Sequence, residues 1–323
     1  MRIDRAIEAL RGDRSAQRLA QSALAESATG WRQGADVAPL LADLQRFGAG
    51  ASLGECGALR SALTDLDMAR RLTVGWVSAI GGTLADVPLG HVPFRHQLAE
   101  GFTVLQLGRA SRATLSLVQY TPVEPAAPPH SVCFTDGERR EICFAGRADA
   151  RRVTRSGSGE TKVRLTFEPA SIAPGSTLAF AGRDETKIVD RIAAPLTLLR
   201  LSRQPEAPLP SLEYRLEDGS LLHRAAGDCR ESRSELMLAL LGRMERRDAV
   251  PAMRALSREG SDSLRWQALR ECLALDSAAG FQALADIARN PADSLHAPAA
   301  KLHTELRMRY PDLARRELDP CLA

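Results

Sequence analysis

The first 85 residues carry apolar positions at helical spacing, in a stretch rich in Ala, Leu, Arg and Glu. Ile3, Ile7 and Leu10 recur about one helical turn apart, which is typical of an amphipathic helix. The predicted helices are 2–27, 36–48 and 52–78. We expect Gly30 to end the first helix, because glycine is a poor helix former and a frequent helix terminator.

From Pro88 onward the pattern changes to short apolar runs separated by turn residues, which predicts β-strands. The predicted strands are 102–107, 113–120, 131–135, 140–144, 147–155, 161–167, 176–181, 187–192, 195–203, 211–216 and 220–224. Asp136-Gly137 and Asp218-Gly219 each lie between two of these runs and predict tight hairpins. Many short strands joined by turns predict an antiparallel sandwich, barrel or jelly roll rather than a parallel sheet.

Helical spacing returns from Ser232, where Leu236, Leu240, Leu241 and Met244 form one apolar stripe. An internal repeat follows, in which 263–275 aligns with 294–306 at an offset of 31 residues. The predicted helix pairs are 234–257, 263–289 and 294–318. They resemble HEAT-like repeats. Such a pair cannot bury its apolar face alone, so the resemblance implies a stacked α-solenoid that docks a protein or peptide partner.

The middle region carries a second resemblance. Pro169–Phe180 resembles the second half-motif of cupin β-barrels, and Phe144–Ala148 resembles the end of their first motif. The resemblance implies a jelly roll. Metal-binding cupins also carry an HxH pair, which this sequence lacks, and Gly182–Thr186 occupies the place of the second-motif histidine. We therefore expect a cupin-like barrel whose metal site is absent or rebuilt.

Together these patterns predict an α+β chain in three parts: N-terminal helices over 1–85, a central antiparallel β-sandwich or jelly roll over 86–228, and a HEAT-like α-solenoid over 229–323.

Composition restricts the class of protein. Of 43 basic residues only three are lysine, which is typical of a GC-rich bacterial genome. A net charge of +3 and 4% aromatic residues argue against a nucleic-acid partner. The six cysteines form no CxxC pair, and we expect reduced thiols. No signal peptide or membrane span is evident in the sequence, so we predict a cytoplasmic location without a membrane partner.

Three histidines are candidate metal ligands. His91 and His96 are five residues apart, and His130 precedes Cys133 at HxxC spacing. Imidazole and thiolate groups suit iron or zinc. The alternative is that these are loop and edge histidines with local hydrogen bonds. Neither spacing completes a site by itself, so no cofactor is our first expectation and Fe or Zn the alternative.

Two further groups are candidates for binding. The first is a cluster of strand arginines that could hold an anion, because guanidinium groups bind carboxylate and phosphate well: Arg151, Arg152, Arg155 and Arg164. A solvated basic face is the alternative for this cluster. The second is a partner-binding patch at the start of a repeat helix, because Trp and Arg dominate protein interfaces: Arg265, Trp266 and Arg270. A core position is the alternative for Trp266.

No P-loop or GxGxxG motif is found, and the sequence favours a non-catalytic binding or adaptor protein. In this hypothesis the helical repeats dock a protein or peptide and the β-domain holds a small ligand. One alternative is a metal-dependent cupin-type enzyme with an irregular histidine site. Another is a ligand-sensing regulator that acts through protein contacts.

Overall fold

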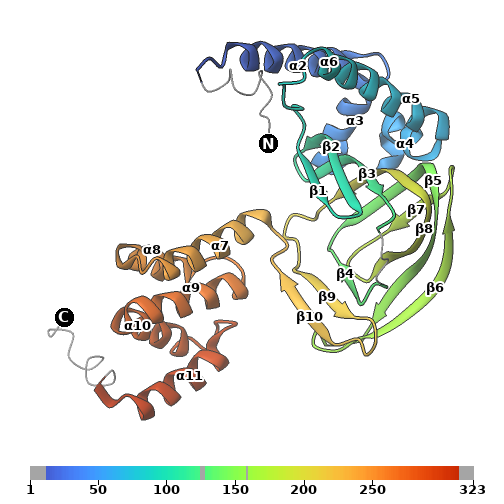
Figure 1. The fold of residues 1–323 in the computed structure, drawn as a ribbon. Coiled ribbons are helices and arrows are strands. Elements are labelled where there is room, and N and C mark those ends of the chain that lie inside the picture. The colour runs from blue at the N-terminus through green and yellow to red at the C-terminus, as the bar shows by residue number, and fades with distance from the viewer. Residues whose placement is uncertain (1–11, 124–127, 158, 313–323) are drawn as a thin grey trace. The chain divides into compact units, whose positions relative to one another are not determined.

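A computed structural model of the chain describes residues 12–123, 128–157 and 159–312. The chain divides into two compact units, Met1–Arg224 and Ala225–Ala323, which are described separately. Figure 1 shows the course of the chain through its helices and strands. Within the described residues, no helix combines the length and apolar character needed to cross a membrane.

The first unit begins with a helical layer. Its elements are α2 (Ser15–Gln33), α3 (Val37–Ala49), η1 (Leu53–Glu55), α4 (Gly57–Thr64), α5 (Leu66–Trp76), η2 (Val77–Gly81) and α6 (Gly82–Asp86). The prediction that Gly30 ends the first helix is wrong, because α2 continues through it. The single helix predicted over 52–78 is also wrong. Asp65 caps α5 by accepting hydrogen bonds from the backbone of Asp67 and Met68, and this capped start separates α5 from α4.

A β-domain of ten strands completes the first unit. The strands are β1 (His96–Ala99), β2 (Phe102–Ala110), β3 (Ala113–Tyr120), β4 (Ser131–Phe134), β5 (Glu138–Ser156), β6 (Arg164–Ile172), β7 (Thr177–Phe180), β8 (Glu185–Arg203), β9 (Ser211–Arg215) and β10 (Leu221–Ala225). The large sheet has the order β1-β2-β3-β8-β5-β6, with β7 also paired to β5, and the small sheet has the order β10-β9-β4. The described pairings in the large sheet are antiparallel.

The strand pairings correct two expectations. Asp136-Gly137 does not make a hairpin, because β4 pairs with β9 while β5 pairs with β6, β7 and β8. The runs 140–144 and 147–155 form one strand, β5, and 187–192 and 195–203 form another, β8. Register shifts between Cys143 and Ala150 let these long strands bend without ending. The hairpin predicted at Asp218-Gly219 is confirmed by the adjacent strands β9 and β10.

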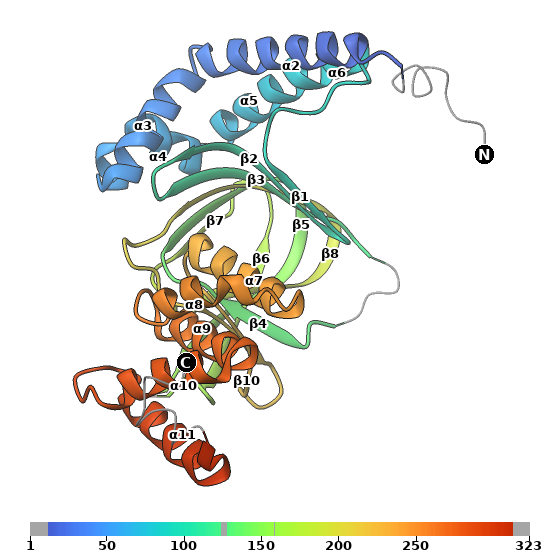
Figure 2. The same ribbon diagram turned by 90° about the vertical axis from the view of Figure 1, so that its left-hand side faces the viewer.

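The helical layer covers one face of the large sheet, as Figure 2 shows. Leu24, Leu44 and Phe47 from the helices share one core with Leu115 and Leu199 from the strands. Two glycines allow α3 to approach β2 closely. A Cβ atom on Gly48 would lie 2.1 Å from the carbonyl oxygen of Ala110, and one on Gly108 would lie 2.9 Å from leucine side chains of α3.

An arginine on β8 ties the sheet to the same helix. The Arg203 guanidinium lies 3.9 Å from the Phe47 ring centroid and donates to the carbonyl oxygens of Phe47 and Ala51. Phe47 is in the last turn of α3 and Ala51 follows the helix, so these two bonds hold the end of α3 to the sheet.

The second unit consists of helices. They are α7 (Cys229–Arg243), η3 (Arg247–Ala249), α8 (Val250–Leu256), α9 (Asp262–Leu275), α10 (Ser277–Ala288) and α11 (His296–Arg309). Two small cores hold them together, one around Leu238, Met253 and Ala268 and the other around Phe281 and Leu295. The last predicted pair, 294–318, contributes one helix, α11, up to Arg309, and residues 313–318 lie outside the described part of the chain.

Candidate functional site

Side-chain alternation separates the two faces of the large sheet. On β5, Ile142 and Phe144 belong to the core with the helices, so Glu141 and Cys143 point to the opposite face. On β8, Leu199 and Leu201 belong to the same helix-facing core, which places Arg200 beside Glu141 on the opposite face. That face curls inward beneath the helical layer (Figure 2), and it encloses a second core that includes Cys143 and Leu198.

Glu141 is the centre of a buried charge cluster on this inner face, which we call the Glu141 cluster. Its carboxylate is 1% exposed. Lys187 donates to Oε2, and Arg200 Nε donates to Oε1 at 2.6 Å. Arg139 Nε lies 3.5 Å from Oε1. The cluster therefore consists of one carboxylate and three cations: Glu141, Arg139, Lys187 and Arg200.

The curvature of β8 brings these residues together. Lys187 and Arg200 are thirteen positions apart on one strand, which would separate them by roughly 40 Å if the strand were straight. Both nevertheless contact the Glu141 carboxylate. Arg139, at the start of β5, likewise reaches Thr186 at the start of β8, with a distance of 3.2 Å from Nη2 to Oγ1. The inner face is therefore strongly curved around the cluster.

The pKa values of the ionisable groups in the cluster differ from their usual values. Burial alone would raise the pKa of Glu141, but Arg200, Lys187 and Arg139 lower it to about 2. Burial lowers the pKa of Lys187 to about 8, although Glu141 opposes the change. Burial also lowers the pKa of Arg139. The lysine and arginine shifts both express the cost of holding positive charge away from water.

The cluster carries two more positive charges than negative charges. Within the described residues, Glu141 is the only carboxylate within ion-pair distance of Arg139, Lys187 or Arg200. Arg139 Nε is buried and makes no hydrogen bond, so one donor is still free. The side chains of Arg139 and Arg200 are 21% and 18% exposed, so part of each side chain is in contact with solvent. Uncompensated buried charge is costly, and an anion placed here would relieve that cost.

Uncharged polar groups complete the site. Tyr120 from β3 accepts a hydrogen bond from Arg200 at 3.2 Å, and burial raises the pKa of this phenol, so its proton is retained at neutral pH. Cys133 on β4 is exposed, and Arg139 acts electrostatically on its thiol.

Three of the arginines predicted as an anion site are already paired with carboxylates. One of them, Arg152, lies beside the Glu141 cluster, because it shares the Phe180 ring with Arg139 and is the cross-strand partner of Lys187. Arg151 contacts Asp190 at 2.7 Å, Arg152 contacts Glu185 at 2.5 Å and Arg155 contacts Asp184 at 2.9 Å. Arg155 is 8% exposed and donates to Tyr214, which makes it a core residue. Arg164 is exposed at the start of β6. The structure does not gather these four side chains into one free cationic face.

The structure brings two of the three predicted metal ligands together and places the third elsewhere. The His91 and His96 rings have centroids 5.4 Å apart, and His96 Nδ1 lies 3.1 Å from the Phe94 carbonyl oxygen. His130 lines a separate pocket of about 580 Å³ together with Arg151. Among the residues that the structure describes, no three His, Cys, Asp or Glu side chains are grouped closely enough to hold a metal ion.

The inner face does not fit the metal that a cupin-like fold implies. Three of the four charged groups at its centre are cations, and these groups repel a metal ion. The remaining carboxylate is fully engaged by them. We therefore derive no metal-dependent step at the Glu141 cluster.

In the helical unit, two of the three predicted partner-binding residues have structural contacts. Arg265 pairs with Asp293 at 2.5 Å and donates to the Ser257 carbonyl oxygen. Trp266 is partly buried against the core around Phe281. Arg270 is exposed, and its role stays a prediction. The contact between Arg265 and Asp293 links the two copies of the repeat, because Asp293 is the counterpart of Asp262.

An apolar stripe on α7 is exposed instead. Leu236, Met237, Leu240 and Met244 are 71%, 61%, 57% and 55% exposed. Leu236, Leu240 and Met244 are four residues apart and therefore share one helix face. The spacing predicted a buried face, and this expectation is wrong because Leu238 and Leu241 on the other side of α7 pack into the core.

Sequence reasoning missed the Glu141 cluster. Glu141 and Arg139 are two positions apart in a strand that otherwise buries apolar residues, and Lys187 is one of only three lysines. The sequence contained one indication of this cluster: a charged residue occupies a strand position next to residues that belong to the core. Nothing local connects Lys187 to Glu141, which is 46 residues away.

Comparisons with known proteins identify no family. No family model matches the sequence, and no curated protein matches it significantly. Several solved structures are similar to parts of the chain. A Cupin_2 domain of an XRE family transcriptional regulator from Enterobacter cloacae is 13% identical, with 33% of this chain and 99% of that chain covered and a TM-score of 0.23.

Two enzymes are similar at the same level. Hydroxypropylphosphonic acid epoxidase from S. wedmorenis is 13% identical, with 56% of this chain and 97% of that chain covered and a TM-score of 0.27. An oxalate decarboxylase from Lactobacillus farciminis is 15% identical, with 41% and 40% covered and a TM-score of 0.28. TM-scores this low establish neither a family nor a function for this chain.

Proposed function

We propose that the β-domain of this chain binds a small molecule with carboxylate or phosphate groups at the Glu141 cluster, and that the chain acts as a binding protein. The excess of two positive charges around one buried carboxylate is the observation that carries this proposal. Arginine forks bind such anions in a bidentate manner. Lys187, with its pKa lowered to about 8, adds a point charge that is still protonated at neutral pH.

The other ion pairs of the β-domain differ from the Glu141 cluster in their charge balance, and this difference supports the assignment. Arg151, Arg152 and Arg191 each face one carboxylate, so their charges cancel locally. The Glu141 cluster lacks this balance and is also the most deeply buried of these groups. A bound dianion would bring its net charge to zero and would accept a hydrogen bond from Arg139 Nε.

We further propose that the C-terminal helices form HEAT-like repeats that dock a protein or peptide through the α7 stripe of Leu236, Met237, Leu240 and Met244. Its support is the exposure of four large apolar side chains on one helix, since monomeric proteins rarely expose contiguous apolar patches without a binding role. Together with the β-domain, this makes the chain an adaptor that links a small anion to a protein partner.

Titration calorimetry of the full-length chain with malonate, succinate, citrate and inorganic phosphate tests the small-molecule part. We expect at least one anion to bind with a Kd below about 1 mM, and Arg139→Gln to weaken it by at least about tenfold, which is about 1.4 kcal/mol. Arg191→Gln is the matched control, because Arg191 is also on the large sheet but is 75% exposed and paired with Asp149. No binding of any of the four anions, or equal loss in both variants, would refute the proposal.

A further inference from the structure

The Glu141 cluster lies at one end of two rows of polar residues that cross the inner face of the large sheet. We call them the polar rows. The strand register defines the first row, which crosses β2, β3, β8 and β5 in turn: Gln106, Ser116, Arg200 and Glu141. Arg95 extends this row by one position, because its carbonyl oxygen accepts a hydrogen bond from the Gln106 backbone at 2.8 Å.

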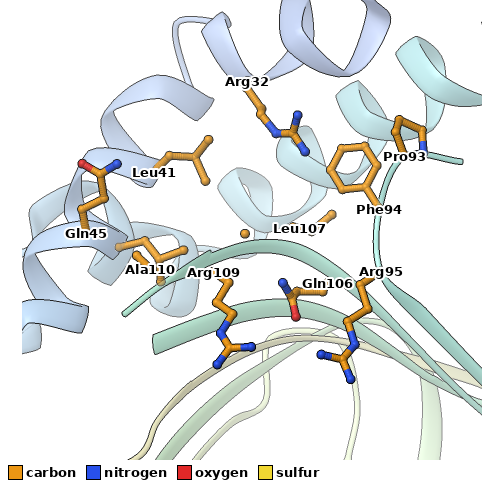
Figure 3. Close-up of a pocket in the computed structure, with 12 residues that line it drawn as sticks. Arg32, Leu41, Gln45, Pro93, Phe94, Arg95, Gln106, Leu107, Arg109 and Ala110 are labelled. Carbon is orange, nitrogen blue, oxygen red and sulfur yellow. The ribbon is translucent and has the colours of Figure 1, made fainter. Parts of the chain in front are cut away.

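The second polar row lies beside the first and crosses the same four strands: Arg109, Thr114, Ser202 and Arg139. Leu115 and Leu201, the strand neighbours of Thr114 and Ser202, belong to the core with the helices. The residues of the rows therefore point to the opposite, inner face. Figure 3 shows the Arg95, Gln106 and Arg109 side chains extending from this face, away from the helices.

Positive charge continues along the polar rows from the buried cluster to exposed positions. Arg95 and Arg109 are both exposed, at the ends of the rows that lie away from Glu141. Glu141 is the only acidic residue in the two rows. Within the described part of the chain, Arg95 and Arg109 form no ion pair. The inner face therefore offers cations at two places, one at each end of the rows.

Neutral hydrogen-bonding groups lie between these two cationic places. Thr114, Ser116 and Ser202 contribute hydroxyl groups, and Gln106 contributes an amide. Among the residues that the structure describes, these four side chains have no hydrogen-bond partner, so their donors and acceptors are available to a ligand. Ser116 is buried, and a buried polar group that lacks a partner costs stability. A ligand with hydroxyl groups beside its acid group would supply such partners.

The two cationic places are three strand spacings apart. Because neighbouring strands are about 4.8 Å apart, the backbones of Arg109 and Arg139 are separated by roughly 14 Å. Side chains on a concave face converge, which shortens the distance between their charged groups. An elongated molecule with an acid group at each end matches this separation better than a single compact anion.

We propose that the ligand of the Glu141 cluster is a hydroxylated dicarboxylate of the sugar-diacid class. This inference rests on the anion-binding function proposed above and specifies the ligand of that site. One carboxylate binds to Arg139 and Arg200, and the other binds to Arg109, because guanidinium forks match the planar carboxylate. The hydroxyl groups of the ligand bind to the serine and threonine side chains between them.

Titration calorimetry of the full-length chain with glucarate, adipate and gluconate tests this proposal. Adipate has the carbon chain and both carboxylates of glucarate but no hydroxyl groups, whereas gluconate has the hydroxyl groups but one carboxylate. We expect glucarate to bind at least about tenfold more tightly than either of the other two. Ser202→Ala should weaken glucarate binding by at least about threefold, through loss of one hydrogen bond, and leave adipate binding unchanged.

Arg109→Gln tests the second carboxylate site. It should weaken glucarate binding by at least about tenfold and leave gluconate binding unchanged, because the single carboxylate of gluconate occupies the Glu141 cluster. The matched control is Arg140→Gln. Arg140 is exposed on β5 and lies between Arg139 and Glu141, so its side chain points to the other face of the sheet. This control should bind all three acids as the unchanged chain does.

Equal affinity for glucarate and adipate, or the same effect of Arg109→Gln as of Arg140→Gln, would overturn this proposal. Either result leaves anion binding at the Glu141 cluster in place if citrate or succinate still binds and its affinity still depends on Arg139. Absence of binding by every acid tested would overturn the proposed function together with this inference.

Discussion

At the scale of single residues, the main functional indication is a group of cationic side chains with too few carboxylates to balance their charge. Several arginines of the β-domain face a carboxylate, and their charge is used within the fold. At the Glu141 cluster three cations share one carboxylate. The cluster therefore suits an anion.

Glu141 should control the acid stability of the β-domain. Its pKa is about 2 in the folded chain and 4.5 in the unfolded reference, so the unfolded state binds more protons between these values. The stabilisation is complete above pH of about 4.5 and is lost as the pH falls toward 2. Urea unfolding across this range should show a steep loss of the free energy of unfolding.

Glu141→Gln should remove that acid dependence and lower the free energy of unfolding at pH 7 by about 3–5 kcal/mol, because it leaves buried cations without a partner. Glu168→Gln is the control, since Glu168 is exposed on β6. A change in Glu141→Gln as small as in this control would mean that solvent already neutralises the cluster.

The helices and strands are positioned by close contacts between particular residues as well as by burial of their apolar faces. Helix α3 lies on β2 at Gly48, where no side chain fits against the Ala110 carbonyl oxygen. Strand β8 continues for 19 residues and bends until residues near its two ends contact one carboxylate. The first contact fixes the helical layer on the sheet, and the second closes the inner face around the Glu141 cluster.

Two glycine substitutions should have opposite effects on stability. Gly48→Ala should lower the free energy of unfolding of the first unit by at least about 2 kcal/mol, because its Cβ would lie 2.1 Å from a backbone oxygen and overpacking is costly. Gly30→Ala should raise it by about 0.5–1 kcal/mol, because Gly30 is inside α2 with nothing within 4 Å and alanine favours a helix. Chemical denaturation measures both, and destabilisation by Gly30→Ala would contradict this account of the packing.

At the scale of the whole chain, the division into Met1–Arg224 and Ala225–Ala323 assigns the proposed anion site at the Glu141 cluster and the proposed partner site to different units. The first unit has a continuous core shared by its helices and sheet. The second has two small cores of its own. We therefore expect the two units to unfold independently.

The tryptophans allow a direct measurement of this independence. Trp31 and Trp76 are in the first unit and Trp266 is in the second. Fluorescence of Trp266→Phe in a urea titration reports the first unit, and fluorescence of Trp31→Phe/Trp76→Phe reports the second. We expect different midpoints, with the smaller helical unit unfolding at lower urea concentration because it buries less apolar surface. Coincident midpoints that shift together in Gly48→Ala would indicate one cooperative unit instead.

Local features of the sequence determined the type of most elements. Alternating apolar runs located strands such as β3, and the Asp218-Gly219 dipeptide located the β9–β10 hairpin. The aligned Asp262 and Asp293 marked equivalent places in the repeat, and Arg265 joins them in the structure. These features are readable because turn geometry, strand alternation and helix periodicity depend on residues only a few positions apart.

Tertiary structure alone decided strand pairing and the sites. Asp136-Gly137 has the composition of a hairpin, yet β4 pairs with β9, about 80 residues further along the chain. Lys187 meets Glu141 only because β8 curves. A sequence pattern records which face a residue occupies, whereas the partner on that face depends on bends and long-range pairings. The net charge of a site depends on all of these partners, so it can be determined only from the folded structure.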